Sequence, residues 1–228
     1  MKKNINLVKG THDIYGVDME KFEFIIENFY SVCKNFNFKS IQTPIIEQQE
    51  LFSRTVGEQT DIVSKEMYSF LDKGDINICL RPEATSGLAR FAATNYQSGL
   101  MKLITHGPMF RRERPQKGRY RQFHQINIET IGEKNPYIDF ELILVAKLLF
   151  DELGINKNIY KLLINSLGSK EDQYNYSNIL KKYLSTFKNK LSETSILRLD
   201  KNPLRILDSK DAEDVEILKN APQISDHL

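Results

Sequence analysis

Two pairs of β-prone segments, each joined by a polar connection, constrain the fold of this chain more than any other feature. Met67–Leu71 and Ile76–Leu80 flank the turn signal Asp-Lys-Gly-Asp at residues 72–75. Met101–Arg111 and Arg119–Ile131 are joined by a charged loop. Such neighbouring hairpins indicate antiparallel pairing, because parallel strands need a long crossover between them. With helical segments on either side, they predict an α+β fold in which an antiparallel sheet is flanked by helices.

Helical periodicity surrounds these hairpins. Apolar residues at three- and four-residue steps predict an amphipathic helix over Asp18–Asn37. A short helix is predicted over about Thr85–Asn95. A third begins at Asn135-Pro136, where a capping side chain precedes a proline in the first turn, and runs to Leu153.

The last third of the chain reads differently. Apolar alternation over Tyr160–Ile164 predicts a half-buried strand, and Tyr176–Leu191 has the periodicity of an amphipathic helix. No glycine occurs after Gly168, so a glycine-rich ligand loop is excluded from the last 60 residues. We therefore expect a core domain over residues 1–168 and a helical segment over 169–228.

Composition excludes several classes of protein. Hydrophobic residues make up 40% of the 228 residues and charged residues 27%, which is typical of a water-soluble globular chain. Cys33 and Cys79 lie far apart, and the histidines show no metal-ligand spacing, so we expect reduced thiols, a cytoplasmic location and no metal site. The longest apolar stretch, Leu142–Phe150, is too short to span a membrane, and no signal peptide is recognisable.

The segment Arg111–Arg121, here called the arginine loop, concentrates positive charge. It holds five arginines and one lysine against one glutamate, whereas the net charge of the whole chain is +2. Guanidinium groups are planar forks that match phosphate oxygens, and aromatic and amide groups lie among them, as expected of a surface that binds a nucleotide. The alternative is a solvated basic loop.

The strand that follows the arginine loop carries a polar face. At a period of two, one face presents Phe123, Gln125, Asn127, Glu129 and Ile131. A glutamate would be a costly misfit in an apolar core. This face either binds a polar ligand or is exposed to water, and the residues alone leave both open.

A third candidate is the turn Arg81-Pro82-Glu83-Ala84-Thr85, which lies between a predicted strand and a predicted helix. The carboxylate of Glu83 and the hydroxyl of Thr85 can both reach one ammonium group. The alternative is a capping arrangement, in which Glu83 or Thr85 accepts hydrogen bonds from amides at the start of the helix.

Together these segments resemble the class II aminoacyl-tRNA synthetases, and specifically the histidyl-tRNA synthetase family, from Lys9 to Asp226. Gly107–Gln125 is similar to motif 2 of that family, and Thr43–Glu47 is similar to motif 1, a dimer-interface element. Leu80–Thr85 looks like the histidine-contacting turn, although the family more often has glycine where Ala84 stands. Two further stretches read as family segments, Asn165–Ser169 and Asn202–Asp208.

The resemblance implies a class II catalytic core and a role for each matching residue. Arg111 would be the catalytic residue and hold the α-phosphate of ATP, with Arg119 as a second ATP contact. Arg114 and Gln116 would contact the tRNA. The residues implied to bind histidine are Glu83, Ala84, Thr85, Gln125 and Glu129, of which Glu129 would accept from the imidazole ring.

The implied substrates are L-histidine, ATP with Mg²⁺, and the acceptor end of histidine tRNA. The implied assembly is a homodimer through motif 1, with no membrane contact. Two family segments do not occur here, a histidine-specific Arg-Gly-Leu-Asp-Tyr-Tyr-like motif and the glycine-rich motif 3, nor does an anticodon-binding domain. We therefore expect an incomplete catalytic core, from a fragment or a split gene.

Two other interpretations compete with this one. The first is the regulatory subunit of histidine biosynthesis, a non-catalytic relative in which the motif 2 loop is typically altered, whereas here it is intact. The second is a non-catalytic dimerising fragment that holds tRNA or another partner.

Overall fold

A computed structural model describes residues 5–57, 60–166 and 168–227. The chain forms two compact units, Met1–Tyr160 and Lys161–Leu228, each of which is described by itself. The division falls before the boundary expected at Gly168. Leu167, part of a stretch that resembles the family, and the terminal Leu228 lie outside the described residues.

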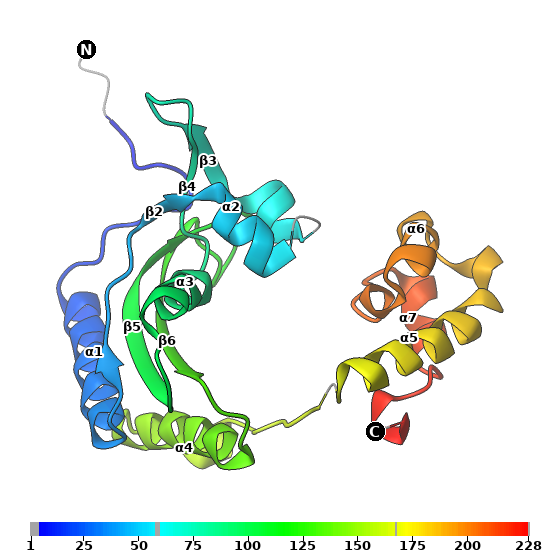
Figure 1. Ribbon diagram of the computed structural model, residues 1–228. Helices are drawn as coiled ribbons and strands as arrows, with labels where there is room; N and C mark the ends of the chain where they lie inside the picture. Colours follow the sequence, from blue (N-terminus) through cyan, green and yellow to red (C-terminus); the bar gives the residue numbers. More distant parts are fainter. Residues whose placement is uncertain (1–4, 58–59, 167, 228) are drawn as a thin grey trace. The chain divides into compact units, whose positions relative to one another are not determined.

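The first unit is built on one long hairpin (Figure 1). Strands β5 (Met101–Phe110) and β6 (Gln122–Ile131) pair antiparallel along their whole length. This confirms the predicted hairpin. Strand β1 (Lys39–Ser40) adds a short parallel pairing to β5, so the sheet order is β1-β5-β6 and the sheet is not purely antiparallel.

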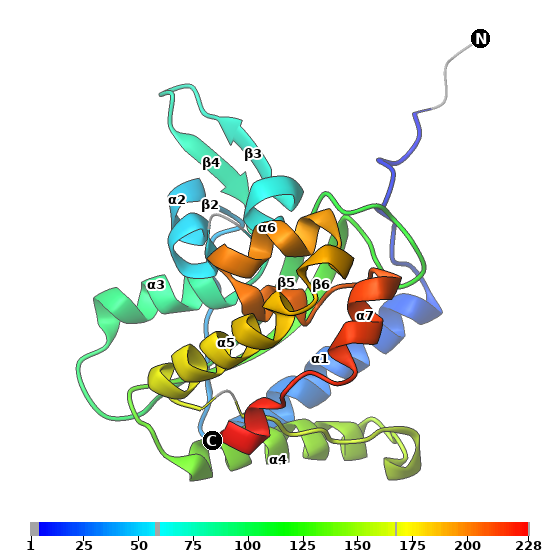
Figure 2. The same ribbon diagram turned by 90° about the vertical axis from the view of Figure 1, so that its right-hand side faces the viewer.

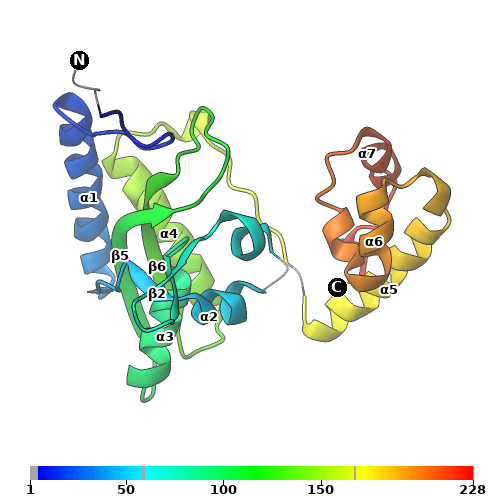
Figure 3. The same ribbon diagram turned by 90° about the horizontal axis from the view of Figure 1, so that it is seen from above.

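Two helices pack against one face of this hairpin, α1 (Val17–Asn35) and α4 (Pro136–Glu152) (Figure 3). Apolar side chains of both helices enclose the core of the unit. Asn135 caps α4 by accepting from the Tyr137 amide at 3.0 Å, as predicted. The buried core residues are Phe29, Val32, Cys33, Phe38, Ile104, Val145 and Leu149.

A second, smaller sheet lies at the other end of the unit (Figure 2). It has the order β2-β4-β3. Asp72 closes the predicted β3–β4 turn by accepting from the amides of Gly74 and Ile76 at 2.7 and 2.9 Å. The elements of this region are β2 (Ile46–Gln48), α2 (Gln49–Phe52), two π-helical turns (Ser53–Gly57 and Ile62–Glu66), β3 (Tyr68–Leu71), β4 (Asn77–Leu80) and α3 (Thr85–Asn95).

The second unit is helical and has a core of its own. The strand predicted over Tyr160–Ile164 was wrong, because this stretch pairs with no other described strand and Leu162, Leu163 and Ile164 are exposed. A short 3-10 turn, Lys157–Ile159, precedes it. The elements of the unit are α5 (Lys170–Ser185), α6 (Glu193–Lys201), α7 (Ala212–Leu218) and 3-10 turns at Lys188–Lys190, Pro203–Ile206 and Ile224–His227.

One buried carboxylate joins α6 and α7 of this unit. The Asp214 carboxylate is fully buried and accepts from the Ser192 amide at 2.9 Å. It also accepts from the hydroxyls of Ser192, Ser195 and Ser209 at 2.6–2.7 Å. Burial alone would raise the pKa of Asp214, but these hydrogen bonds together lower it below the usual value. In the described ranges, no helix is long and apolar enough to cross a membrane.

Candidate functional site

The polar face predicted for β6 lies on the side of the hairpin opposite to the apolar core. Thr105 of β5 pairs with Asn127 of β6, and Gly107 pairs with Gln125, so these residues share one face. Three buried oxygens on it have no hydrogen-bond partner among the described residues: Thr105 Oγ1, Gln125 Oε1 and Asn127 Oδ1. An unsatisfied buried polar atom costs about 1–3 kcal/mol. These oxygens are enclosed and can still accept hydrogen bonds, so the face is not simply a solvent-exposed surface.

Arg81, at the start of the Arg-Pro-Glu turn, is a buried connector. Its Nε donates to the Pro108 carbonyl at 3.0 Å, and its Nη1 donates to the carbonyl and hydroxyl of Thr43 at 3.0 and 3.1 Å. Burial lowers the pKa of the Arg81 guanidinium, and the nearby Glu47 partly opposes that shift. A side chain at position 107 would collide with Arg81, so glycine is required there.

Glu83 and Thr85 position the start of α3 against β6. The Glu83 carboxylate accepts from the amides of Thr85 and Ser86 at 2.6 and 3.0 Å, which is the capping arrangement left open by the sequence. The Thr85 hydroxyl donates to Glu129 Oε1 at 2.6 Å. Ala84 is buried. Glu83, Thr85 and Glu129 therefore meet at one end of the polar face.

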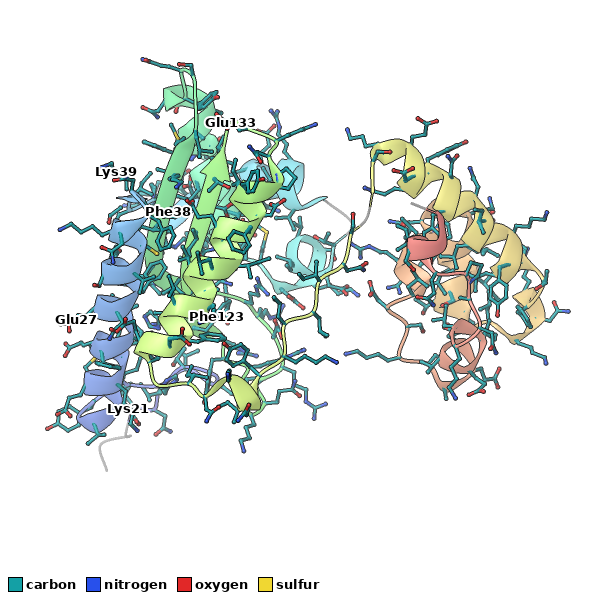
Figure 4. All side chains as sticks on the ribbon, turned by 90° about the horizontal axis from the view of Figure 1, so that it is seen from below. Lys21, Glu27, Phe38, Lys39, Phe123 and Glu133 are labelled. Carbon is teal, nitrogen blue, oxygen red and sulfur yellow. The ribbon has the colours of Figure 1, made fainter. Side chains whose placement is uncertain are left out.

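Arg111 lies over the same face at its other end. Its Nε donates to the Pro82 carbonyl at 2.9 Å, and its guanidinium carbon lies 5.3 Å from the centroid of the Phe123 ring. Figure 4 labels Phe123, near the start of β6, and Glu133, which follows the end of that strand. The cation is thus held between a carbonyl and an aromatic ring, and its Nη1 lies 4.0 Å from Glu113 Oε1.

The arginine loop closes on itself and on one carboxylate. Gln116 and Arg119 exchange backbone hydrogen bonds of 3.2 and 2.9 Å around the tip, where Gly118 has a φ of +78°. Arg119 Nη1 lies 3.2 Å from Glu113 Oε2. Glu113 therefore faces both arginines expected to bind ATP. Arg114 and Gln116 are exposed on the loop.

Two anchors of the loop were not found from the sequence. The Arg121 amide donates to the Gly10 carbonyl at 2.7 Å, and the Arg112 amide donates to the Glu66 carbonyl at 2.6 Å. Burial raises the pKa of Glu66, and the charge of Glu113 adds to that shift. Both anchors accept through backbone carbonyls, which every residue carries, so no side-chain pattern reveals them.

The chain is similar to histidyl-tRNA synthetases in sequence and in structure. A family model described as histidyl-tRNA synthetase matches residues 10–190. A histidine–tRNA ligase of Novosphingobium aromaticivorans is 47% identical over 226 residues, which cover 97% of this chain and 54% of that protein. The structure of apo histidyl-tRNA synthetase from S. aureus matches with a TM-score of 0.76 and 30% identity, over 99% of this chain and 50% of that one.

A third similarity concerns the fold alone. The structure named as an ATP phosphoribosyltransferase regulatory subunit/histidyl-tRNA synthetase from Bacillus halodurans C matches with a TM-score of 0.60 at 19% identity, over 99% of this chain and 64% of that one. The present chain spans about half the length of the curated relatives it matches. The hairpin with its polar face, the arginine loop and the match over residues 10–190 establish that the chain belongs to the histidyl-tRNA synthetase family.

Proposed function

We propose that this chain provides the histidine- and ATP-binding part of a histidine–tRNA ligase. The reaction is ATP-dependent activation of L-histidine to histidyl-adenylate, followed by transfer to the 3′ end of histidine tRNA. The observation that supports this best is the row of buried, unpartnered oxygens on the β5–β6 face, with Arg111 over one end and Glu129 at the other. Such a face suits a small molecule that carries donors at both ends.

Histidine fits this face by its hydrogen-bonding chemistry. Its α-ammonium group has three donors, for which the partnerless Gln125 Oε1 and the oxygens of Glu83 and Thr85 are acceptors. Ala84 is buried and would contact the substrate through its backbone only. The imidazole N–H would donate to Glu129, which already accepts from Thr85.

ATP would bind between Arg111 and Arg119. The histidine carboxylate attacks the α-phosphorus, the bond to pyrophosphate breaks, and negative charge grows on the α-phosphoryl oxygens. Arg111 would stabilise that charge with two fixed donors. Glu113 faces both arginines, so the phosphates would compete with this carboxylate for them. Mg²⁺ would arrive with ATP as part of that substrate.

The remaining assignments concern partners. Arg114 and Gln116 are exposed on the arginine loop and would contact the acceptor end of tRNA. The segment Thr43–Glu47 would form a homodimer interface. In support, Ile45 and Ile46 are 42% and 51% exposed there, and β2 is an edge strand of its sheet among the described residues. A cytoplasmic location is part of the same proposal.

Histidine-dependent exchange of pyrophosphate into ATP tests the proposal. The chain is assayed alone and mixed with a polypeptide that covers the C-terminal half of a related ligase. We expect exchange in the mixture with histidine, and none with phenylalanine, whose ring lacks a hydrogen-bond donor. Arg111→Ala should abolish it. A mixture that forms a complex but shows no histidine-dependent exchange would refute the proposal and favour a non-catalytic binding fragment.

A further inference from the structure

The N-terminal segment Val8–His12, here called the N-terminal strap, lies against the base of the arginine loop. It turns tightly, since the amide and hydroxyl of Thr11 both bond to the Val8 carbonyl at 3.0 and 2.8 Å. The Gly10 carbonyl then accepts from the Arg121 amide at 2.7 Å. The ring of His12 lies 4.6 Å from that of Tyr120. The strap therefore contacts the loop through backbone and side chain.

Gly10 is required at this contact for two separate reasons. Its φ is +88°, a conformation that residues with a side chain rarely adopt. A Cβ at this position would also lie 2.8 Å from Arg121 Cγ and 2.9 Å from Pro115 Cγ. With any other residue here, either the strap or the side chains of Arg121 and Pro115 would have to shift.

The contact extends to the residue assigned to the α-phosphate. The Arg121 carbonyl accepts from the Arg111 amide at 3.0 Å, and Arg121 Nε donates to the Glu113 carbonyl at 3.3 Å. Two hydrogen bonds thus connect Gly10 to Arg111 through one residue. We propose that the N-terminal strap is a positioning element, which anchors the arginine loop at Arg121 and fixes the backbone at Arg111. Its catalytic consequence rests on the proposed function.

Limited trypsin digestion of the unliganded chain tests the positioning directly. Trypsin cleaves after the exposed Lys117 and Arg119 when the loop opens. Loss of one backbone hydrogen bond changes the open population about fivefold, so Gly10→Ala should raise the cleavage rate there by about that factor. The matched control is Gly16→Ala, because Gly16 has a φ of +60° but a Cβ there meets nothing within 4 Å. Both glycines have a positive φ, and Gly16→Ala should cleave at the wild-type rate.

A fluorescence measurement separates positioning from overall stability. The chain contains no tryptophan, so Tyr120→Trp introduces a single reporter next to His12. At a temperature well below unfolding, Gly10→Ala should lower the anisotropy of this reporter, and Gly16→Ala should leave it unchanged. His12→Ala, which adds no backbone strain, should lower it as well and provides the test if Gly10→Ala does not fold.

Equal cleavage rates for Gly10→Ala and Gly16→Ala would overturn the proposal. Unchanged anisotropy of the Tyr120→Trp reporter in both Gly10→Ala and His12→Ala would also overturn it. If Gly10→Ala does not fold, unchanged anisotropy in His12→Ala is sufficient to overturn it. Neither readout needs a ligand or activity. A negative result here therefore leaves the pyrophosphate-exchange test intact, and a failure of that test leaves the strap result intact.

Discussion

Replacement of Asp214 tests whether one buried carboxylate holds the helical unit together. Asp214→Ala leaves three serine hydroxyls and the Ser192 amide without their acceptor. Breaking a buried charged network of this kind costs about 3–5 kcal/mol. A unit of about 70 residues has a total stability on the order of 3–10 kcal/mol, so this variant should lose a large part of it. Asp214→Asn keeps the shape but loses the charge, and should cost about 2 kcal/mol.

The same carboxylate makes stability depend on pH. Because hydrogen bonds lower the pKa of Asp214 in the folded state, its contribution is fully present above the pKa of the unfolded chain, about 3.9. It is lost as the pH falls through the lower, folded-state pKa. Wild-type stability of the unit should therefore decrease below about pH 4, and the decrease should be smaller in Asp214→Asn.

Hydrogen exchange followed by mass spectrometry measures the opening of this unit within the intact chain. Peptides from α5, α6 and α7 should lose protection together in Asp214→Ala, while peptides from β5 and β6 keep theirs. Asp208→Asn, at an exposed position of the same unit, is the control and should behave as wild type. Wild-type protection in Asp214→Ala would refute the reasoning, since it would mean that the serines find other partners without loss.

Three further predictions concern the candidate site and the thiols. In the complemented exchange assay, Arg111→Lys should lower kcat about 10²–10³-fold, because lysine cannot supply paired donors, and a wild-type rate would remove it from the site. Glu129→Gln should weaken histidine binding by about 2–4 kcal/mol in calorimetric titration while ATP binding changes little; unchanged histidine affinity would contradict its role. Burial raises the pKa of Cys33 to about 12 and of Cys79 to about 11. Neither thiol should therefore react with N-ethylmaleimide at pH 8 until the chain is unfolded. Rapid labelling of the folded chain would be evidence against the burial of these thiols.

The sequence predicted those elements whose signals are local. The Asn135-Pro136 helix start, the helix Thr85–Asn95 and the two hairpins each depend on residues a few positions apart, and all were confirmed. The strand over Tyr160–Ile164 failed because alternation shows only that a segment could pair. A strand forms only where a second strand is available to pair with it, and the apolar alternation of one segment does not show whether such a strand exists.

The candidate site was predicted in part for the same reason. The β6 period placed Gln125 and Glu129 on one face, and the register with β5 confirms that geometry. Their proposed roles stay predictions. The sequence could not supply the neighbour of the arginine loop, because Gly10 lies about a hundred positions before Arg121 and contributes a carbonyl oxygen. For Glu83 it left two roles open, and the structure shows one of them, the cap of α3.

Arg81 connects two segments of the first unit that lie far apart in the sequence. One side chain holds Thr43, in the proposed dimer interface, and Pro108, in the strand that leads to Arg111. Its backbone carbonyl also accepts from Phe110, next to Arg111. Because the connection is a buried, charged fork, it cannot lengthen without losing several hydrogen bonds together. Replacement of Arg81 should therefore disturb the proposed dimer interface at Thr43 and the backbone next to Arg111 together.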